Sequence, residues 1–194
     1  MALKDQIIHE ALRLYSLKGY LGTTIDDILK ATNSSKGGFY NHFKSKEDLF
    51  HHVLKEARNI WRQRNLTGLK PDSPPIDNMK HFLENFRDFY LKDSENFPGG
   101  CIFITLLIEL RDQHPHLAKE IIRGFSGMKG LIQRYLQQAR EAGELKDAVD
   151  IEAMTEMIFH GMLGATITYN SGVPGENGDK AINHIIDYIK QTEM

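Results

Sequence analysis

Residues 34–48, SSKGGFYNHFKSKED, combine the side chains best suited to contact with a charged partner. Two adjacent glycines, Gly37 and Gly38, precede three aromatic residues and a histidine, with lysines on both sides. A glycine inside a helix costs roughly 1 kcal/mol relative to alanine, so two of them in a helical stretch need a reason. Near the start of a helix, glycines let the backbone lie close to a partner and leave N–H groups free for phosphate oxygens.

The neighbouring polar and cationic side chains suit the same partner. A DNA duplex carries phosphates at regular intervals, and lysine, tyrosine and histidine side chains bind them. The residues available for such contacts are Lys36, Tyr40, His42, Lys44 and Lys46. Phe43 is expected in the core between the first and fourth helices, and Phe39 partly so.

The flanking sequence predicts short helices on both sides of a turn. An apolar pattern at helical spacing stops at Gly19, and Thr24 and Asp27 then form a capping-box variant that opens a second helix. Asn33 tolerates left-handed backbone and suits a tight turn before a helix over about 35–41. Such an arrangement describes a helix-turn-helix, whose second helix enters the major groove of DNA.

The charge distribution supports this interpretation mildly. The chain has a net charge of −2, but residues 1–60 carry nine basic and seven acidic side chains, and residues 36–64 carry seven and three. Positive charge therefore surrounds the glycine segment, as expected of a DNA-binding surface. The alternative is a loop at the glycines, an ordinary half-buried Tyr40 and a solvated lysine-rich face.

Residues 7–50 resemble the N-terminal domain of the TetR (tetracycline-repressor-like) family of bacterial transcription regulators. The resemblance spans about a quarter of the chain and rests on GYLGTTIDDIL, Ala31 and SKGGFYNHFKSKEDLF. Two positions depart from the family pattern: Asn33 replaces the usual turn glycine, and Ser34 stands where a small apolar residue is common.

The resemblance implies an all-α homodimeric repressor that binds a palindromic double-stranded operator and responds to a small-molecule effector, without a cofactor. It implies a helix-turn-helix domain over 1–50 and a ligand-binding and dimerisation domain over 51–194, with a linker helix over 46–65. The DNA-binding residues carried over are Thr24, Ser35, Lys36, Gly37, Gly38, Tyr40, His42 and Lys46. Among them, His42 has the alternative of a solvent-facing histidine without a role.

The rest of the chain also reads as helix. Three of the six prolines lie in LTGLKPDSPPID, residues 66–77, the best linker candidate. Helices are predicted at about 77–93, 101–113, 116–142, 150–170 and 178–192, with a break at NSGVPGENGD. No strand pattern is sustained, so the predicted fold class is all-α.

Aromatic and apolar residues of the C-terminal part are candidates for an effector pocket, which favours a small apolar or aromatic ligand. The predicted lining is Trp61, Phe86, Phe89, Tyr90, Phe103, Leu107, Met128, Tyr135 and Met157. A plain hydrophobic core is the alternative for each of them.

Cys101 offers a different route to regulation. FPGGCIFITLLIEL, residues 97–110, resembles a segment of one subgroup of the family, in some members of which a cysteine responds to electrophiles or oxidants. At a helix N-terminus the macrodipole and free N–H groups lower a thiol pKa. A small buried residue is the alternative.

The last two predicted helices are candidates for the dimer interface, as the resemblance implies. Small residues on one helix would let the apolar face of another pack closely. The predicted interface residues are Gly161, Gly164, Ala165, Ile182, Ile185 and Ile189. A core within one chain is the alternative.

Composition and motifs exclude several other classes. Hydrophobic residues make up 41% and charged residues 26%, no apolar run approaches a membrane span, and the N-terminus lacks the apolar core of a signal peptide, so a cytoplasmic protein is expected. A single cysteine excludes an intrachain disulfide.

No phosphate loop, HExxH motif or nucleophile elbow indicates an enzyme, and the histidines lack acidic partners at metal-ligand spacing. The other rival is a helical ligand-binding protein that does not contact DNA.

Overall fold

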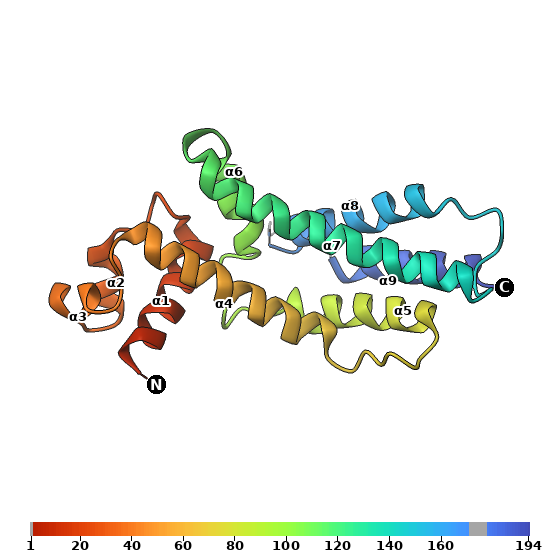
Figure 1. Ribbon diagram of the computed structural model, residues 1–194, viewed down its shortest axis with the longest axis horizontal. Coiled ribbons are helices and arrows are strands. Elements are labelled where there is room, and N and C mark those ends of the chain that lie inside the picture. Colours follow the sequence, from red (N-terminus) through yellow and green to blue (C-terminus); the bar gives the residue numbers. More distant parts are fainter. Residues whose placement is uncertain (1, 171–177) are drawn as a thin grey trace. The chain divides into compact units, whose positions relative to one another are not determined.

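In the computed structural model, residues 2–170 and 178–194 are described, and their regular structure is helical (Figure 1). This confirms the predicted all-α class; an isolated bridge pairs Leu145 with Glu193. The predicted break at NSGVPGENGD lies mostly outside the described residues. The helices are α1 Leu3–Lys18, α2 Ile25–Ala31, α3 Lys36–Tyr40, α4 Lys46–Leu66, α5 Pro75–Asn85, the π-helical segment η1 Phe86–Tyr90, α6 Ile102–Gln113, α7 Pro115–Glu141, α8 Ile151–Asn170 and α9 Gly178–Thr192.

The chain forms two compact units. The first comprises Met1–Arg62 and Asp93–Ile121, and the second comprises Gln63–Lys92 and Ile122–Met194. This division differs from the ranges 1–50 and 51–194 expected from the sequence because α6 packs against α1. The N-terminal helices therefore share their compact unit with a segment from the middle of the chain.

The core of the first unit gathers around α1. Helices α2 and α3 both pack on α1 (Figure 1). Phe43 is 1% exposed, as predicted, and Phe39 is fully buried, so it belongs to the core more completely than expected. Their rings lie 5.4 Å apart, which ties the end of α3 to the apolar interior.

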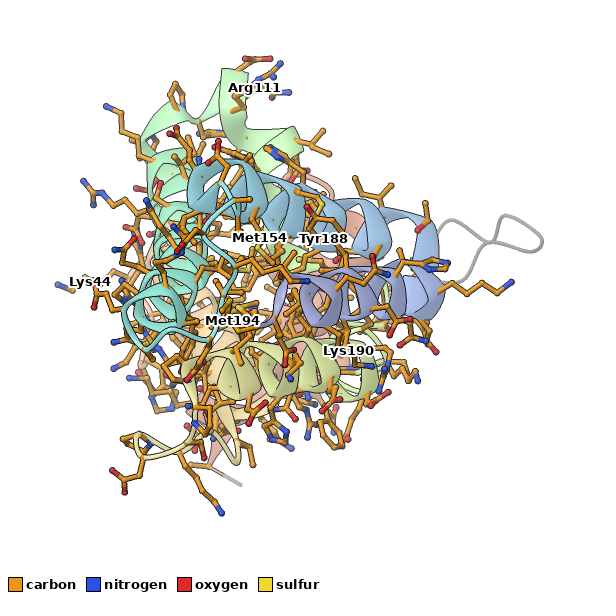
Figure 2. All side chains as sticks on the ribbon, turned by 90° about the vertical axis from the view of Figure 1, so that its right-hand side faces the viewer. Lys44, Arg111, Met154, Tyr188, Lys190 and Met194 are labelled. Atoms are coloured by element: carbon orange, nitrogen blue, oxygen red, sulfur yellow. The ribbon has the colours of Figure 1, made fainter. Side chains whose placement is uncertain are left out.

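The second unit contains α5, η1, α8, α9 and parts of α4 and α7. Helices α8 and α9 run side by side (Figures 1 and 2). Each contributes an apolar stripe at helical spacing to the core, as expected for helices that bury one face. The buried residues of this pair include Met154, Ile158, Met162, Ile182, Ile186 and Ile189.

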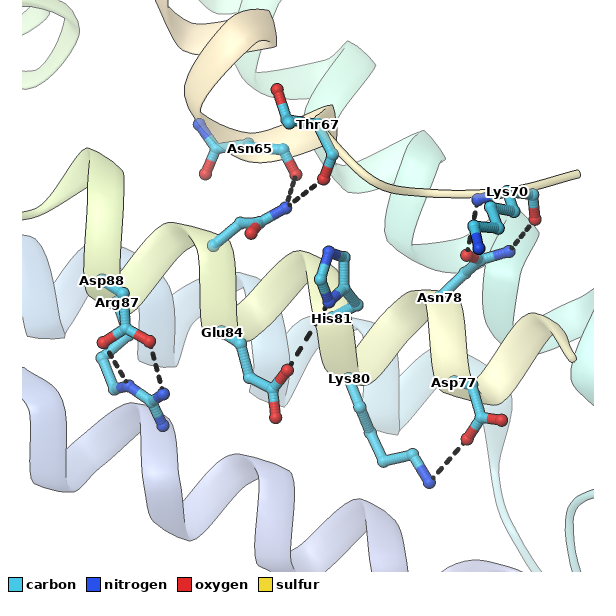
Figure 3. Close-up of polar contacts among 11 residues, drawn as sticks. Asn65, Thr67, Lys70, Asp77, Asn78, Lys80, His81, Glu84, Arg87 and Asp88 are labelled. Carbon is cyan, nitrogen blue, oxygen red and sulfur yellow. Dashed lines mark hydrogen bonds and ion pairs between the residues drawn. The ribbon is translucent and has the colours of Figure 1, made fainter. Parts of the chain in front are cut away.

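The predicted linker is held against α5 by side-chain amides (Figure 3). Asn78 accepts a hydrogen bond from the Lys70 backbone N–H at 3.1 Å and donates to the Lys70 carbonyl at 2.7 Å. Asn85, which is buried, donates to the carbonyls of Asn65 and Thr67. Helix α5 begins at Pro75, slightly before the predicted start, because proline suits the first helical position.

The predicted helix over 77–93 changes its winding at η1. The Leu91 N–H donates to the Phe86 carbonyl at 2.9 Å, a bond that spans five residues. Phe86 and Tyr90 stack with ring centroids 5.5 Å apart, and both are buried. The wider turn removes Phe89 from the face of Phe86, and Phe89 is 55% exposed.

Candidate nucleic-acid interface

The N-terminus of α2 is fixed by the predicted capping box. The Asp27 N–H donates to the Thr24 hydroxyl oxygen at 3.1 Å, and the Thr24 N–H donates to the Asp27 carboxylate at 2.8 Å. These hydrogen bonds from the Thr24 backbone and side chain hold the pKa of Asp27 below its usual range. Thr24 itself is exposed, so the start of α2 is open to a partner.

The turn between α2 and α3 follows the sequence prediction. Asn33 has a φ of +48°, the left-handed conformation expected of it. The Ser34 hydroxyl lies 2.7 Å from that of Thr32, which in turn donates to the Ile28 carbonyl at 2.9 Å. Ser34 thus anchors the turn to the end of α2 by a polar contact where an apolar residue is usual.

The first turn of α3 is capped by Ser35, and few atoms lie close to its two glycines. The Ser35 side chain accepts a hydrogen bond from the Gly38 N–H at 3.1 Å. A Cβ atom built on Gly37 would meet nothing closer than the Ser35 Oγ, at 3.8 Å, and one on Gly38 would lie 3.3 Å from a terminal carbon of Leu3. Gly37 is exposed and its φ is not positive. The folded chain therefore does not require a glycine at position 37.

Most of the predicted DNA-binding side chains form an exposed surface on α2, α3 and the following loop. Tyr40 is 55% exposed, with its ring against the buried Phe39. Lys36 forms an exposed ion pair with Asp26 at 3.3 Å. Lys44 extends away from the ribbon (Figure 2). The exposed members of the predicted set are Thr24, Ser35, Lys36, Gly37, Tyr40 and His42, and Gly38 is half-buried.

Lys46 differs from the other predicted contacts because it is half-buried. Its Nζ atom lies 4.2 Å from the centre of the Tyr20 ring. Burial is the main cause that lowers the Lys46 pKa, and the nearby carboxylates of Glu109 and Asp27 oppose that shift. Lys46 thus connects the start of α4 to the residues that follow α1.

The carboxylate of Glu109 on α6 contacts the backbone of Tyr20 and Leu21, a contact that no sequence pattern predicts. The Tyr20 N–H donates to Glu109 Oε2 at 2.7 Å, and the Leu21 N–H donates to Oε1 at 2.9 Å. Gly19, with a φ of +75°, passes so close to this carboxylate that a Cβ atom would lie 2.5 Å from Oε1. A contact between residues almost ninety positions apart leaves no local signal in the sequence.

The predicted pocket residues are divided between the two compact units. Trp61, Phe103 and Leu107 belong to the first unit, and the other six belong to the second. Phe89 and Met157 are exposed, so they do not line a pocket within their unit: the π turn moves Phe89 outwards, and Met157 lies on the outer face of α8. Phe86 and Tyr90 are buried, and the remaining five are half-buried.

Cys101 lies directly before α6, as predicted, and is half-buried. Its carbonyl oxygen accepts hydrogen bonds from Ile104 and Thr105 in the first turn of that helix. The sensor role stays a prediction. Among the described residues, no group of three histidine, cysteine, aspartate or glutamate side chains could hold a metal ion, and no helix could span a membrane.

The predicted interface residues belong largely to the core of the second unit. Ala165, Ile182, Ile185 and Ile189 are all buried within the chain, so their side chains are not available to a second copy. Gly161 lies against Ile185, whose Cδ1 would be 2.6 Å from an added Cβ. Gly164, by contrast, is exposed, and a Cβ added there would meet no atom of another described segment within 4 Å.

Two family models match the chain. The model described as "Bacterial regulatory proteins, tetR family" matches residues 7–53, and that described as "Tetracyclin repressor-like, C-terminal domain" matches residues 75–174. The biofilm operon icaADBC HTH-type negative transcriptional regulator IcaR of Staphylococcus aureus is 30% identical over 138 residues, which are 66% of this chain and 72% of IcaR.

Solved structures of TetR-family regulators share the fold of this chain over nearly its whole length. A TetR transcriptional regulator from Chloroflexus aurantiacus superposes with a TM-score of 0.87 at 29% identity, covering 98% of this chain and 96% of that one. AibR, in complex with isovaleryl coenzyme A and operator DNA, shares the fold with a TM-score of 0.72 at 16% identity, covering 96% and 97%. The matched family consists of transcription regulators, which are not enzymes. The chain belongs to the TetR family of bacterial transcription regulators.

Proposed function

We propose that this chain is a repressor whose α3 lies in the major groove of a palindromic operator, with the N-terminus of α2 on the phosphates. The observation that carries the proposal is Gly37. It is an exposed glycine in a helix, without positive φ, and an added Cβ would lie 3.8 Å from its nearest neighbour, so no contact among the described residues requires the missing side chain. A close approach of backbone to DNA accounts for it.

The surrounding residues would divide the contacts between them. Phosphate contacts fix the orientation of a protein on the duplex, and base contacts specify sequence. Thr24 and Ser35, at the capped starts of α2 and α3, would bind phosphates together with the adjacent N–H groups. Lys36, Tyr40, His42 and Lys46 would add further backbone contacts.

Two DNA-binding domains must reach two half-sites about one helical turn apart, so the protein would act as a dimer. TetR-family regulators act as dimers. The surface that we assign to the dimer is the outward stripe of α8, together with the exposed Tyr188 of the neighbouring α9. Its members on α8 are Ala153, Met157, His160, Gly164 and Ile167, all exposed at helical spacing.

An effector would release the operator by binding the DNA-incompetent state better. AibR was solved with isovaleryl coenzyme A as well as operator DNA, which supports a two-ligand scheme for this chain. Buried and half-buried aromatic residues of the second unit favour a small apolar or aromatic effector. A regulator of this kind acts in the cytoplasm, where bacterial DNA lies.

The decisive experiment compares Gly37→Ala with Gly127→Ala. Both glycines lie in exposed helix positions, and an added Cβ would meet no close neighbour at either. Both variants should be more stable than wild type, by up to about 1 kcal/mol. An operator selected from random duplexes should bind Gly37→Ala roughly tenfold or more weakly than it binds wild type, the order of magnitude expected for the loss of a close contact. The same operator should bind Gly127→Ala as tightly as wild type.

Equal operator affinity in the two variants would show that α3 does not approach DNA closely at Gly37. Failure of the wild-type chain to select any duplex would refute DNA binding itself.

A further inference from the structure

Glu109 of α6 holds the segment that joins α1 to α2. Both of its carboxylate oxygens accept backbone hydrogen bonds, from Tyr20 at 2.7 Å and from Leu21 at 2.9 Å. Hydrogen bonds to an ionised acceptor are roughly twice as strong as those between neutral groups. Gly19 provides the space for this contact, since a Cβ there would lie within 2.5 Å of the carboxylate.

The held segment leads directly to the DNA-facing end of α2. Thr23 is fully buried and donates its hydroxyl to the Gly19 carbonyl at 2.8 Å. Thr24, the next residue, is the exposed cap of α2. A displacement of Tyr20 and Leu21 would therefore move Thr24 with it.

The same segment also orients the start of α4. The Tyr20 ring packs edge-on against Phe50 at 5.3 Å, and Lys46 lies over its face at 4.2 Å. Two of the predicted DNA contacts, Thr24 and Lys46, thus depend on the position of residues 20 and 21.

A second contact secures α6 to α1 one turn earlier. Ser16 is buried, and its hydroxyl accepts a hydrogen bond from the Gly99 N–H at 2.9 Å and donates to the Gly100 carbonyl at 3.0 Å. Gly99 approaches the Ser16 backbone so closely that a Cβ would lie 2.1 Å from its carbonyl oxygen. The α6 segment is therefore fixed next to α1, and Glu109 is held where it meets Tyr20 and Leu21.

We propose that Glu109 is a positioning residue for operator binding: its carboxylate, supplied by α6, fixes the Tyr20–Leu21 backbone and thereby places Thr24 and Lys46 for DNA. The proposal rests on the DNA-binding function proposed above. It makes the operator-binding surface a composite of the helix-turn-helix and a helix that begins about sixty residues beyond it.

The proposal predicts that loss of the Glu109 carboxylate weakens operator binding, whereas electrostatics alone predicts that it strengthens binding. The two explanations can therefore be distinguished by experiment. Removal of a carboxylate from a DNA-binding unit raises its positive charge and strengthens its attraction to any duplex. Glu109→Gln removes the negative charge and replaces one of the two acceptor oxygens with an NH2 group, which cannot accept a hydrogen bond from a backbone N–H. Asp112→Asn removes one charge from the same helix, at an exposed side chain that contacts Arg111 and not the α1–α2 segment.

The experiment measures the affinity of the full-length chain for a selected operator and for an unrelated duplex of equal length. Glu109→Gln should bind the operator about tenfold or more weakly, within the usual range of coupling between sites, and the unrelated duplex no more weakly than wild type. Asp112→Asn should bind both at least as tightly as wild type. Operator affinity in Glu109→Gln equal to that in Asp112→Asn would overturn the proposal.

Hydrogen exchange separates positioning from general stability and needs no variant. If the contact favours operator binding, then operator binding must favour the contact by the same factor. In the wild-type chain, the Tyr20 and Leu21 amides should exchange more slowly when the operator is bound, whereas amides at the centre of α6 should change little. Unchanged exchange at both amides would contradict the proposal, even if Glu109→Gln failed to fold.

The outcomes also distinguish this proposal from the function on which it rests. A wild-type chain without operator affinity refutes the function. A wild-type chain that binds, with Glu109→Gln binding equally well and the two amides unaffected, refutes the role of Glu109 alone.

Discussion

Gly37 and Gly99 are both exposed glycines of the first compact unit, yet their surroundings differ sharply. A Cβ on Gly99 would lie 2.1 Å from the Ser16 carbonyl oxygen, whereas one on Gly37 would have 3.8 Å to its nearest neighbour. The first glycine is required by the fold, because another backbone passes through the space of a side chain. The second is required by no contact in the described part of the chain. Comparison of the two shows how a residue kept for an external partner can be recognised from within one molecule.

The largest effect should follow from substitution of the glycine that the fold requires. Gly99→Ala forces a Cβ against backbone rather than against a flexible side chain, so the α6 segment must move away from α1. We expect a loss of about 1–3 kcal/mol in the free energy of unfolding, the usual cost of overpacking. Chemical denaturation of the full chain measures it, with Gly127→Ala as the control that should gain stability. An unchanged unfolding midpoint would remove the distinction between the two kinds of glycine.

The second unit offers a parallel pair on a single helix. Gly161 lies against Ile185 within the chain, whereas Gly164 faces open space three residues later. If the outward stripe of α8 forms the dimer interface, Gly164→Arg should place an unpaired charge in a close contact and yield folded monomers on sedimentation. Operator affinity should fall when the dimer is lost, since a single DNA-binding domain reaches only one half-site.

Gly127→Arg is the matched control, because it makes the same change at an open glycine of α7. It should leave the dimer intact. A dimer lost in Gly127→Arg and kept in Gly164→Arg would move the interface to α7.

Local signals in the sequence were sufficient for the elements that present the DNA-binding residues. The Thr24–Asp27 capping box and the left-handed Asn33 turn depend on residues at most three apart, and both occur as predicted. The contacts of Glu109 and Ser16 could not be predicted, because they join segments more than eighty residues apart.

The second unit shows a different limit of prediction. Helix α8 is apolar on more than one face, so its sequence does not distinguish the stripe against α9 from the stripe towards solvent. Ala165 is therefore buried within the chain while Met157 and Ile167 are exposed. The π turn at Phe86–Tyr90 is likewise invisible to a pattern of α-helical spacing, and it displaces Phe89 from the predicted pocket.

The smallest expected effect concerns two lysines that are both predicted to contact DNA but differ in their burial. Lys36 is exposed and forms an ion pair with Asp26 at 3.3 Å, whereas Lys46 is half-buried over the Tyr20 ring. If each binds one phosphate, Lys36→Ala and Lys46→Ala should both flatten the dependence of log affinity on log salt by about one unit. Lys46→Ala should also lower stability by about 0.5–1 kcal/mol through loss of the cation–π contact, and Lys36→Ala should not. Operator binding across a salt series and thermal unfolding measure the two effects. An unchanged salt slope in Lys46→Ala, with weaker binding, would mean that Lys46 supports the operator-binding surface from within and does not contact a phosphate.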